Sequence, residues 1–188
     1  MLAVAASEQP QVPLARAGNP DAWSALFQRY QLPLYVYIFE LVRHEQTSLD
    51  LVQETFINAV RHLGSLRHDA KFGSWLFSIA HQKCLQHWRK QGKEDLHRGE
   101  MPEGDLELLP GDNEQPDESL VREEQEEEFM QFLNQLPPPH RSVLLLHYLE
   151  DFSLDEIAEI TGAPLGTVKS RLHYARQTLR KLLEEKAP

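Results

Sequence analysis

Cysteine is almost absent from this sequence of 188 residues, which contains only Cys84. A single cysteine excludes an intrachain disulfide and a four-cysteine zinc site. Long apolar runs are also missing, because stretches such as Leu32 to Phe39 are far too short to span a bilayer. The first six residues lack the basic start and long apolar core of a secretory signal. We therefore expect a soluble, cytoplasmic protein without membrane insertion, whose fold depends on packing alone.

The formal net charge of −10 argues at first against nucleic-acid binding. The negative charge is concentrated, however, in residues 93–128, which contain three basic and fifteen acidic side chains. Residues 1–92 carry nine basic and seven acidic side chains, and residues 129–188 carry seven of each. The middle segment also holds three of the nine glycines, a composition typical of a flexible linker.

The charge pattern therefore divides the chain into two small domains joined by a flexible acidic linker. Because both domains show the helix signals described below, we predict an all-α fold. We predict a disordered N-terminus over residues 1–14, a first domain over 15–92, the linker over 93–128 and a second domain over 129–188. The linker is either a solvated tether or a segment that competes with DNA for a basic channel in a partner.

The first domain shows the signals of several helices. Asn19 can cap a helix that Pro20 begins, with an apolar face that continues to Tyr30. Leu34 to Val42 is apolar nearly all round, so we expect it to form a second helix that is buried in the bundle. Thr47 is the expected cap of the next helix, whose buried side runs from Leu51 to Leu63 and includes Val60. Its other side is polar and carries Asp50, Gln53 and Glu54.

A loop is expected from Gly64 to Gly73, with Ser74 as the cap of a further helix that reaches Lys90. The second half of that helix mixes cations with aromatic rings, which is what a surface for single-stranded nucleic acid needs. These residues are Lys83, Arg89 and Lys90 with His81, His87 and Trp88. Although His81, Cys84 and His87 include metal-binding side chains, positions i, i+3 and i+6 spread around a helix. We expect no metal and no cofactor.

The second domain contains a helix-turn-helix pattern. Ser153 and Glu156 form a capping box at the start of a short helix, and Gly162 lies where a helix ends in a left-handed residue. Pro164 lies at or just before the start of a last helix with an uninterrupted apolar stripe. From Leu165 to Leu183 this helix has five basic residues and no acidic one, so it suits a DNA major groove better than plain solvent.

Three segments in order now allow a comparison with known families. The runs LDLVQETFINAV, FGSWLFSIAHQKCLQHWRK and LDEIAEITGAPLGTVKSRL resemble a bacterial sigma factor of the extracytoplasmic-function group. The resemblance implies core bacterial RNA polymerase and promoter DNA as partners, the DNA as duplex and as melted non-template strand. It also implies a role in promoter melting without enzymatic activity in the chain itself. Members of this group are often held inactive by an anti-sigma protein.

The resemblance also implies a role for particular residues. Asp50, Gln53 and Glu54 would dock on the polymerase clamp helices. The Gly64 to Gly73 loop and the helix from Trp75 to Lys90 would hold an extruded base and the melted strand of the minus-ten element. The minus-ten residues are Lys71, Trp75, His81, Gln82, Lys83, Gln86, His87, Trp88, Arg89 and Lys90. The residues that would read the minus-thirty-five duplex are Thr167, Lys169, Ser170, Arg171, His173, Tyr174 and Arg176.

Two other functions are compatible with the residues. A stand-alone regulator would use the helix-turn-helix as a dimer on two related half-sites. A helical adaptor would bind another protein through the polar face around Gln53 and Glu54, independently of DNA. Binding to polymerase separates the sigma-factor hypothesis from the first, and insensitivity to changes at Lys169 and Arg171 would favour the second.

Overall fold

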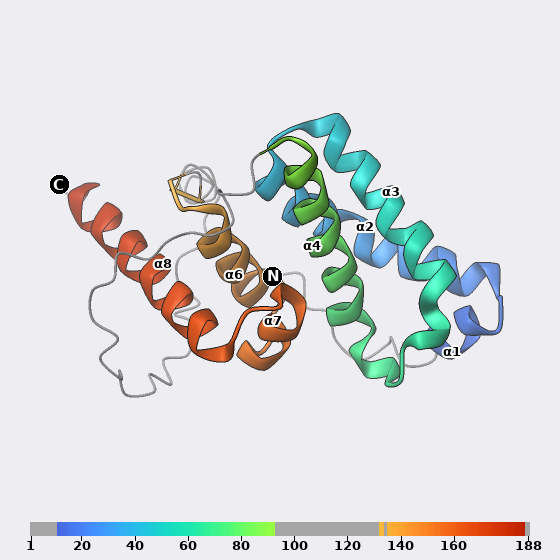
Figure 1. The fold of residues 1–188 in the computed structure, drawn as a ribbon. Coiled ribbons are helices and arrows are strands. Elements are labelled where there is room, and N and C mark those ends of the chain that lie inside the picture. The colour runs from blue at the N-terminus through green and yellow to red at the C-terminus, as the bar shows by residue number, and fades with distance from the viewer. Residues whose placement is uncertain (1–10, 93–131, 134, 187–188) are drawn as a thin grey trace.

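The computed structural model describes residues 11–92, 132–133 and 135–186, and these residues form helices without any strand (Figure 1). The all-α prediction is confirmed. The predicted linker over 93–128 and the first ten residues lie outside the described residues. The described elements are α1 (Gln11–Arg16), α2 (Pro20–Val42), α3 (Glu45–His62), η1 (Leu63–Ser65), η2 (Asp69–Lys71), α4 (Phe72–Lys90), α6 (Pro138–Tyr148), α7 (Leu154–Thr161) and α8 (Leu165–Lys186).

Helix α2 is a single helix of 23 residues, so the prediction of two separate helices is wrong here. Its start is as expected, because the Asn19 side chain accepts hydrogen bonds from the backbone of Asp21 and Ala22. Pro33 lies inside the helix, where it removes one backbone hydrogen bond and crowds the preceding turn. Tyr30 and Leu34 are almost fully buried on either side of Pro33. Burial of this apolar surface offsets the cost of the proline.

Three helix starts differ from the prediction. Helix α1 occupies residues that include 11–14, which were expected to be disordered, because Val12 is fully buried against α2. Helix α3 begins at Glu45 and not after Thr47, since the His44 ring accepts the Thr47 backbone N–H. Helix α4 begins at Phe72, so Ser74 lies inside its first turn and does not cap it.

The second half contains the predicted helix-turn-helix, formed by α7 and α8. The capping box is present, with the Ser153 side chain accepting the Glu156 backbone N–H and the Glu156 carboxylate accepting the Ser153 N–H. Gly162 has a φ of 67°, the left-handed conformation that ends α7. Helix α8 then begins at Leu165, directly after Pro164. These local signals therefore fix the geometry of the turn.

The two halves of the chain pack against each other. Helix α4 lies along α7, and α2 contacts α6 (Figure 1). Buried side chains from both halves form one hydrophobic cluster, in which the Phe152 ring meets the Phe77 ring edge-on at 5.3 Å between centroids. None of the described helices is both long and apolar enough to cross a membrane.

Candidate polymerase and DNA interfaces

The outer face of α3 combines polar and apolar side chains in one exposed stripe. Asp50, Gln53 and Glu54 are all exposed, as the docking hypothesis requires. Ile57 and Val60 continue the stripe towards the end of the helix, with exposures of 48% and 55%. The prediction that Val60 is buried is therefore wrong. Apolar side chains beside polar ones at helical spacing are typical of a protein-docking surface.

A groove between α3 and α4 brings together four of the residues expected to meet the melted strand. Trp75, Gln82, Lys83 and Gln86 line one side of this cavity of about 310 Å³. The α3 side contributes Asn58 and His62, which sequence reasoning had not assigned to the site. The sequence did contain an indication of these two residues, because Asn58 and His62 lie one turn apart on the polar side of the predicted helix. The groove joins an aromatic ring to amide, imidazole and ammonium groups, a set that can stack on and hydrogen-bond to bases.

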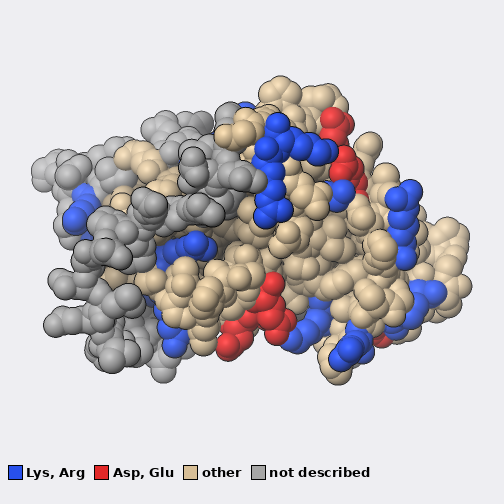
Figure 2. Space-filling view, in the orientation of Figure 1, with Lys and Arg blue, Asp and Glu red and all other residues tan. Residues whose placement is uncertain are grey.

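The groove and the exposed stripe of α3 share one ion pair. The Lys83 ammonium lies 2.8 Å from a carboxylate oxygen of Glu54, which places one predicted DNA contact against one predicted polymerase contact. At the end of α4, Arg89 and Lys90 are exposed, and Figure 2 shows Lys and Arg side chains gathered there. His87 is half-buried, and its ring nitrogen lies 2.9 Å from the Gln91 amide.

His81 and Trp88 are not presented to solvent in this structure. Their exposures are only 3% and 4%, because they lie on the side of α4 that packs into the protein. The sequence pattern of alternating cations and rings does not distinguish these two from the exposed residues around them. Their assignment as single-strand contacts stays a prediction for a rearranged state. Among the described residues, no three His, Cys, Asp or Glu side chains gather in a way that would hold a metal ion.

A buried chain of hydrogen bonds joins the two halves. The Tyr37 hydroxyl of α2 lies 2.8 Å from Nδ1 of His81 in α4 and 2.8 Å from the Ser142 hydroxyl of α6. Burial raises the pKa of the Tyr37 hydroxyl far above its usual range, so the group stays protonated. A phenol hydroxyl both donates and accepts. It can therefore satisfy His81 and Ser142 together.

A second buried contact lies beside this chain. The Arg141 guanidinium of α6 donates to the backbone oxygens of Glu40 and Leu136, and the Glu40 carboxylate pairs with Arg43. Burial raises the pKa of Glu40, although the charges of Arg43 and Arg141 oppose that shift. Nearer the surface, the Lys71 ammonium lies 3.1 Å from the Glu159 carboxylate of α7. The contact between the halves is thus specific and hydrogen-bonded.

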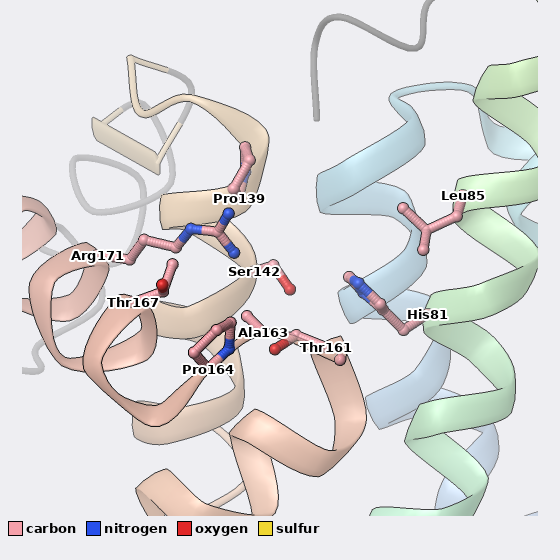
Figure 3. Close-up of a pocket in the computed structure, with 10 residues that line it drawn as sticks. His81, Leu85, Pro139, Ser142, Thr161, Ala163, Pro164, Thr167 and Arg171 are labelled. Carbon is pink, nitrogen blue, oxygen red and sulfur yellow. The ribbon is translucent and has the colours of Figure 1, made fainter. Parts of the chain in front are cut away.

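A cavity of about 420 Å³ separates α4 from the start of α8. His81 and Leu85 form one wall, whereas Thr167 and Arg171 come from α8 on the opposite side (Figure 3). Burial lowers the pKa of Arg171 from its ordinary value. Thr167 and Arg171, which are expected to read duplex DNA, therefore face α4 and are only partly accessible to solvent.

The other predicted residues of α8 are divided between solvent and the interior. Lys169 and His173 are exposed, and Tyr174 is 40% exposed with its ring 4.6 Å from that of His140. Ser170 is half-buried, and its hydroxyl donates to the Gly166 and Thr167 carbonyls. Arg176 is half-buried, and its Nε donates to the Tyr148 hydroxyl at 2.7 Å. The outward set that can meet a groove at once is Lys169, His173 and Tyr174.

Comparison with known proteins matches both halves of the chain. The family described as Sigma-70 region 2 matches residues 26–94, and Sigma-70, region 4, matches residues 126–179. The chain is 32% identical to the RNA polymerase sigma-H factor of Pseudomonas aeruginosa, with 94% of each chain covered. It is 30% identical to the ECF RNA polymerase sigma factor SigW of Bacillus subtilis, with 90% of this chain and 93% of the relative covered.

Solved structures show the same fold. The structure of CnrH in complex with the cytosolic domain of CnrY has a TM-score of 0.66 at 22% identity, covering 96% of this chain and 99% of that chain. The sigma factor RpoE in complex with the anti-sigma factor NepR from Bartonella quintana has a TM-score of 0.60 at 25% identity, covering 87% of this chain and 99% of that chain. Taken with the matched regions, these likenesses show that the chain belongs to the extracytoplasmic-function group of sigma factors, the proteins that direct RNA polymerase to promoters.

Proposed function

We propose that the protein divides promoter recognition among three of its surfaces. The exposed stripe of α3 binds core bacterial RNA polymerase, the α3–α4 groove takes the melted non-template strand, and the outward side of α8 reads the minus-thirty-five duplex. The observation that carries this proposal is the groove, which brings together Trp75, Gln82, Lys83 and Gln86, four of the residues that the resemblance assigns to the minus-ten element. We place this activity in the cytoplasm, where polymerase and promoter DNA meet.

Promoter melting follows from differential binding and needs no catalytic group. Extruding a base from the duplex costs a few kcal/mol of stacking and pairing. A groove that binds the opened strand and not the duplex shifts this equilibrium by the difference between the two affinities. An aromatic ring supplies about 1–3 kcal/mol per stacked base. We therefore propose that the chain is not an enzyme and that polymerase performs the chemistry.

The closed packing of the two halves has to open before both promoter elements are bound. Elements two helical turns apart are separated by roughly 70 Å. In the structure, α8 lies across one small cavity from α4, and hydrogen bonds of 2.8 Å join α2 to both α4 and α6. A cavity of this size cannot admit a DNA duplex. We propose that docking on polymerase separates the halves and turns Thr167 and Arg171 towards DNA.

An anti-sigma protein is the further partner that the solved relatives suggest. The sigma factor RpoE was solved in complex with the anti-sigma factor NepR. We propose that a protein of this class, where one is encoded, inactivates the present chain by covering the α3 stripe or holding the halves closed.

The test is a titration of the purified chain against core bacterial RNA polymerase, followed by transcription from a library of random promoters. We expect tight binding and selective initiation from a two-part promoter. The double variant Gln53→Ala and Glu54→Ala should weaken polymerase binding. A matched double variant at the exposed α2 residues Gln28 and Gln31 should not. Specific binding to duplex DNA without any binding to polymerase would overturn the proposal in favour of a stand-alone regulator.

A further inference from the structure

Helix α1 is fixed on the first half of the protein. Val12 and Ala15 are buried, and the Trp23 indole N–H donates to the Ala15 carbonyl at 3.0 Å. Gly18 follows with a φ of 85°, a left-handed conformation that turns the chain into α2. The last residue of α1 is Arg16, and the position of its side chain is therefore set by a helix that is itself held in the core.

Arg16 reaches the loop between α3 and α4, which we define as residues 63–71. One guanidinium nitrogen, Nη2, donates to the backbone oxygen of Leu66 at 3.2 Å and to Oδ1 of Asp69 at 2.5 Å. The two bonds span 50 and 53 residues of sequence, and Figure 1 shows α1 beside the lower end of α3. Leu66 and Asp69 flank two exposed side chains, Arg67 and His68. Arg16 therefore holds Leu66 and Asp69, the residues on either side of the exposed pair Arg67 and His68. We call this pair the projection and the two bonds from Arg16 the clamp.

The clamp also changes the charge of the loop. Asp69 is the one acidic residue between 63 and 71, and Arg67, Lys71 and the imidazole of His68 lie near it in sequence. The ion pair with Arg16 neutralises the Asp69 carboxylate, which would otherwise repel DNA phosphates. With Asp69 neutralised, the projection presents a guanidinium and an imidazole. Guanidinium groups stack on bases and bind phosphate oxygens in a fixed geometry.

We propose that Arg16 is a positioning residue for base selection in the minus-ten element, and that Arg67 and His68 are the side chains it positions. This inference rests on the proposed function, because it adds the 63–71 loop to the surface that meets the melted strand. A loop that is ordered before binding loses less conformational entropy on binding. Ordering also limits which base fits beside Arg67 and His68. Removing the clamp should therefore reduce discrimination between bases more than it reduces binding to polymerase.

The experiment compares the parent chain with Arg16→Ala on polymerase, using the two-part promoter selected from the random library with each minus-ten position varied in turn. We expect the preference for the favoured base to fall about fivefold at one or two minus-ten positions, a factor that corresponds to the net contribution of one ordinary hydrogen bond. Preferences in the minus-thirty-five element and affinity for core polymerase should not change. Thermal stability should change little, because an ion pair this exposed contributes little to folding.

Three further variants separate positioning from charge and from general structure. Arg16→Ala combined with Asp69→Asn removes the uncompensated carboxylate, so it should restore overall DNA affinity without restoring base preference. Exchanging the pair as Arg16→Asp with Asp69→Arg should restore part of the preference. Trp23→Phe loosens α1 by removing its bond to Ala15, and it should lower the preference at the same positions. Exposed Gln28→Ala is the neutral control.

Two results would overturn the inference. One is an unchanged base preference in Arg16→Ala, and the other is an equal loss at every promoter position together with a lower melting temperature, which would indicate a merely structural role. Failure of the proposed function looks different, because the parent chain itself would then fail to bind polymerase or to select a promoter. A parent that selects promoters while Arg16→Ala selects them equally well refutes the clamp alone.

Discussion

Replacing Tyr37 with phenylalanine tests whether buried hydrogen bonds hold the two halves closed. The change deletes one hydroxyl and with it both bonds of 2.8 Å, to His81 and to Ser142. Each bond contributes about 0.5–1.5 kcal/mol net, and a buried partner left unsatisfied costs about 1–3 kcal/mol. Some of that cost is recovered when the halves separate and water reaches His81 and Ser142. We expect the closed state to lose about 1–3 kcal/mol relative to the open one, roughly a 5- to 150-fold shift.

The shift is measured by fluorescence energy transfer between dyes on the two halves. Gln31→Cys in α2 and Gln177→Cys in α8 place labels at exposed positions. The natural Cys84 does not interfere, because burial raises the pKa of its thiol to about 12 and the reactive thiolate is absent at neutral pH. Tyr35→Phe is the matched control, since Tyr35 lies on the same helix and stacks on Phe39 away from this chain of bonds.

The parent chain should show a high-transfer population that falls in Tyr37→Phe and not in Tyr35→Phe. Ser142→Ala should produce a smaller fall, because it removes the bond that crosses between the halves but leaves His81 bonded to Tyr37. The reasoning is refuted if Tyr37→Phe keeps the transfer distribution of the parent while circular dichroism shows both variants folded. In that case apolar contacts such as the one between Phe77 and Phe152 would hold the halves without help from the hydrogen bonds.

Three other changes test further parts of the structure. Lys169→Ala should weaken binding to minus-thirty-five duplex on polymerase and reduce the slope of log affinity against log salt by about 0.9, and an unchanged slope would remove this phosphate contact. Burial and the charge of Asp151 raise the pKa of Glu150 from its ordinary value of 4.5 to about 7 in the folded state. Between pH 4.5 and pH 7 the folded chain therefore holds a proton that the unfolded chain has lost. Stability should fall as pH rises between these values, and Glu150→Gln should add about 1–3 kcal/mol at pH 8 but nothing at pH 4.5 in chemical denaturation. Gly73→Ala would place a methyl group 3.0 Å from the buried Tyr30 hydroxyl and 3.7 Å from Phe152, so it should lower the unfolding free energy by about 1–2 kcal/mol, measured by urea titration.

The second half was predictable because its signals are local. The capping box of Ser153 and Glu156 satisfies backbone N–H groups at the start of α7, and Gly162 ends that helix. These interactions join groups at most three residues apart, so the sequence contains the whole interaction. The interior of the first half was harder to predict. Pro33 reads as a helix breaker, and only the burial of the side chains around it keeps α2 continuous. Val60 looks like a core residue by spacing, yet it lies on the exposed side of α3.

The types of residue in the candidate site could be predicted from the sequence. Which of them are exposed together on one surface was harder to predict. Trp75, Gln82, Lys83 and Gln86 share one side of α4, which helical spacing already implied. His81 and Trp88 lie on its buried side, where α4 packs against α2 and α7. Contacts in this region join residues far apart in the sequence, such as Phe77 of α4 and Phe152 just before α7. No local pattern specifies a contact at that separation. The groove likewise needed Asn58 and His62 from α3, whose approach to α4 depends on tertiary packing.

The ion pair between Lys71 and Glu159 affects how salt titrations of this protein are interpreted. In the closed state a carboxylate occupies the position beside Lys71 that a DNA phosphate would take in the open complex. If Lys71 binds DNA as the resemblance implies, its binding is therefore an exchange of one anion for another. Added salt screens both pairings, since the ion pair is exposed. The salt slope of promoter binding will thus underestimate the number of phosphate contacts in the complex. The difference equals the number of cationic side chains that are already paired with carboxylates in the closed state.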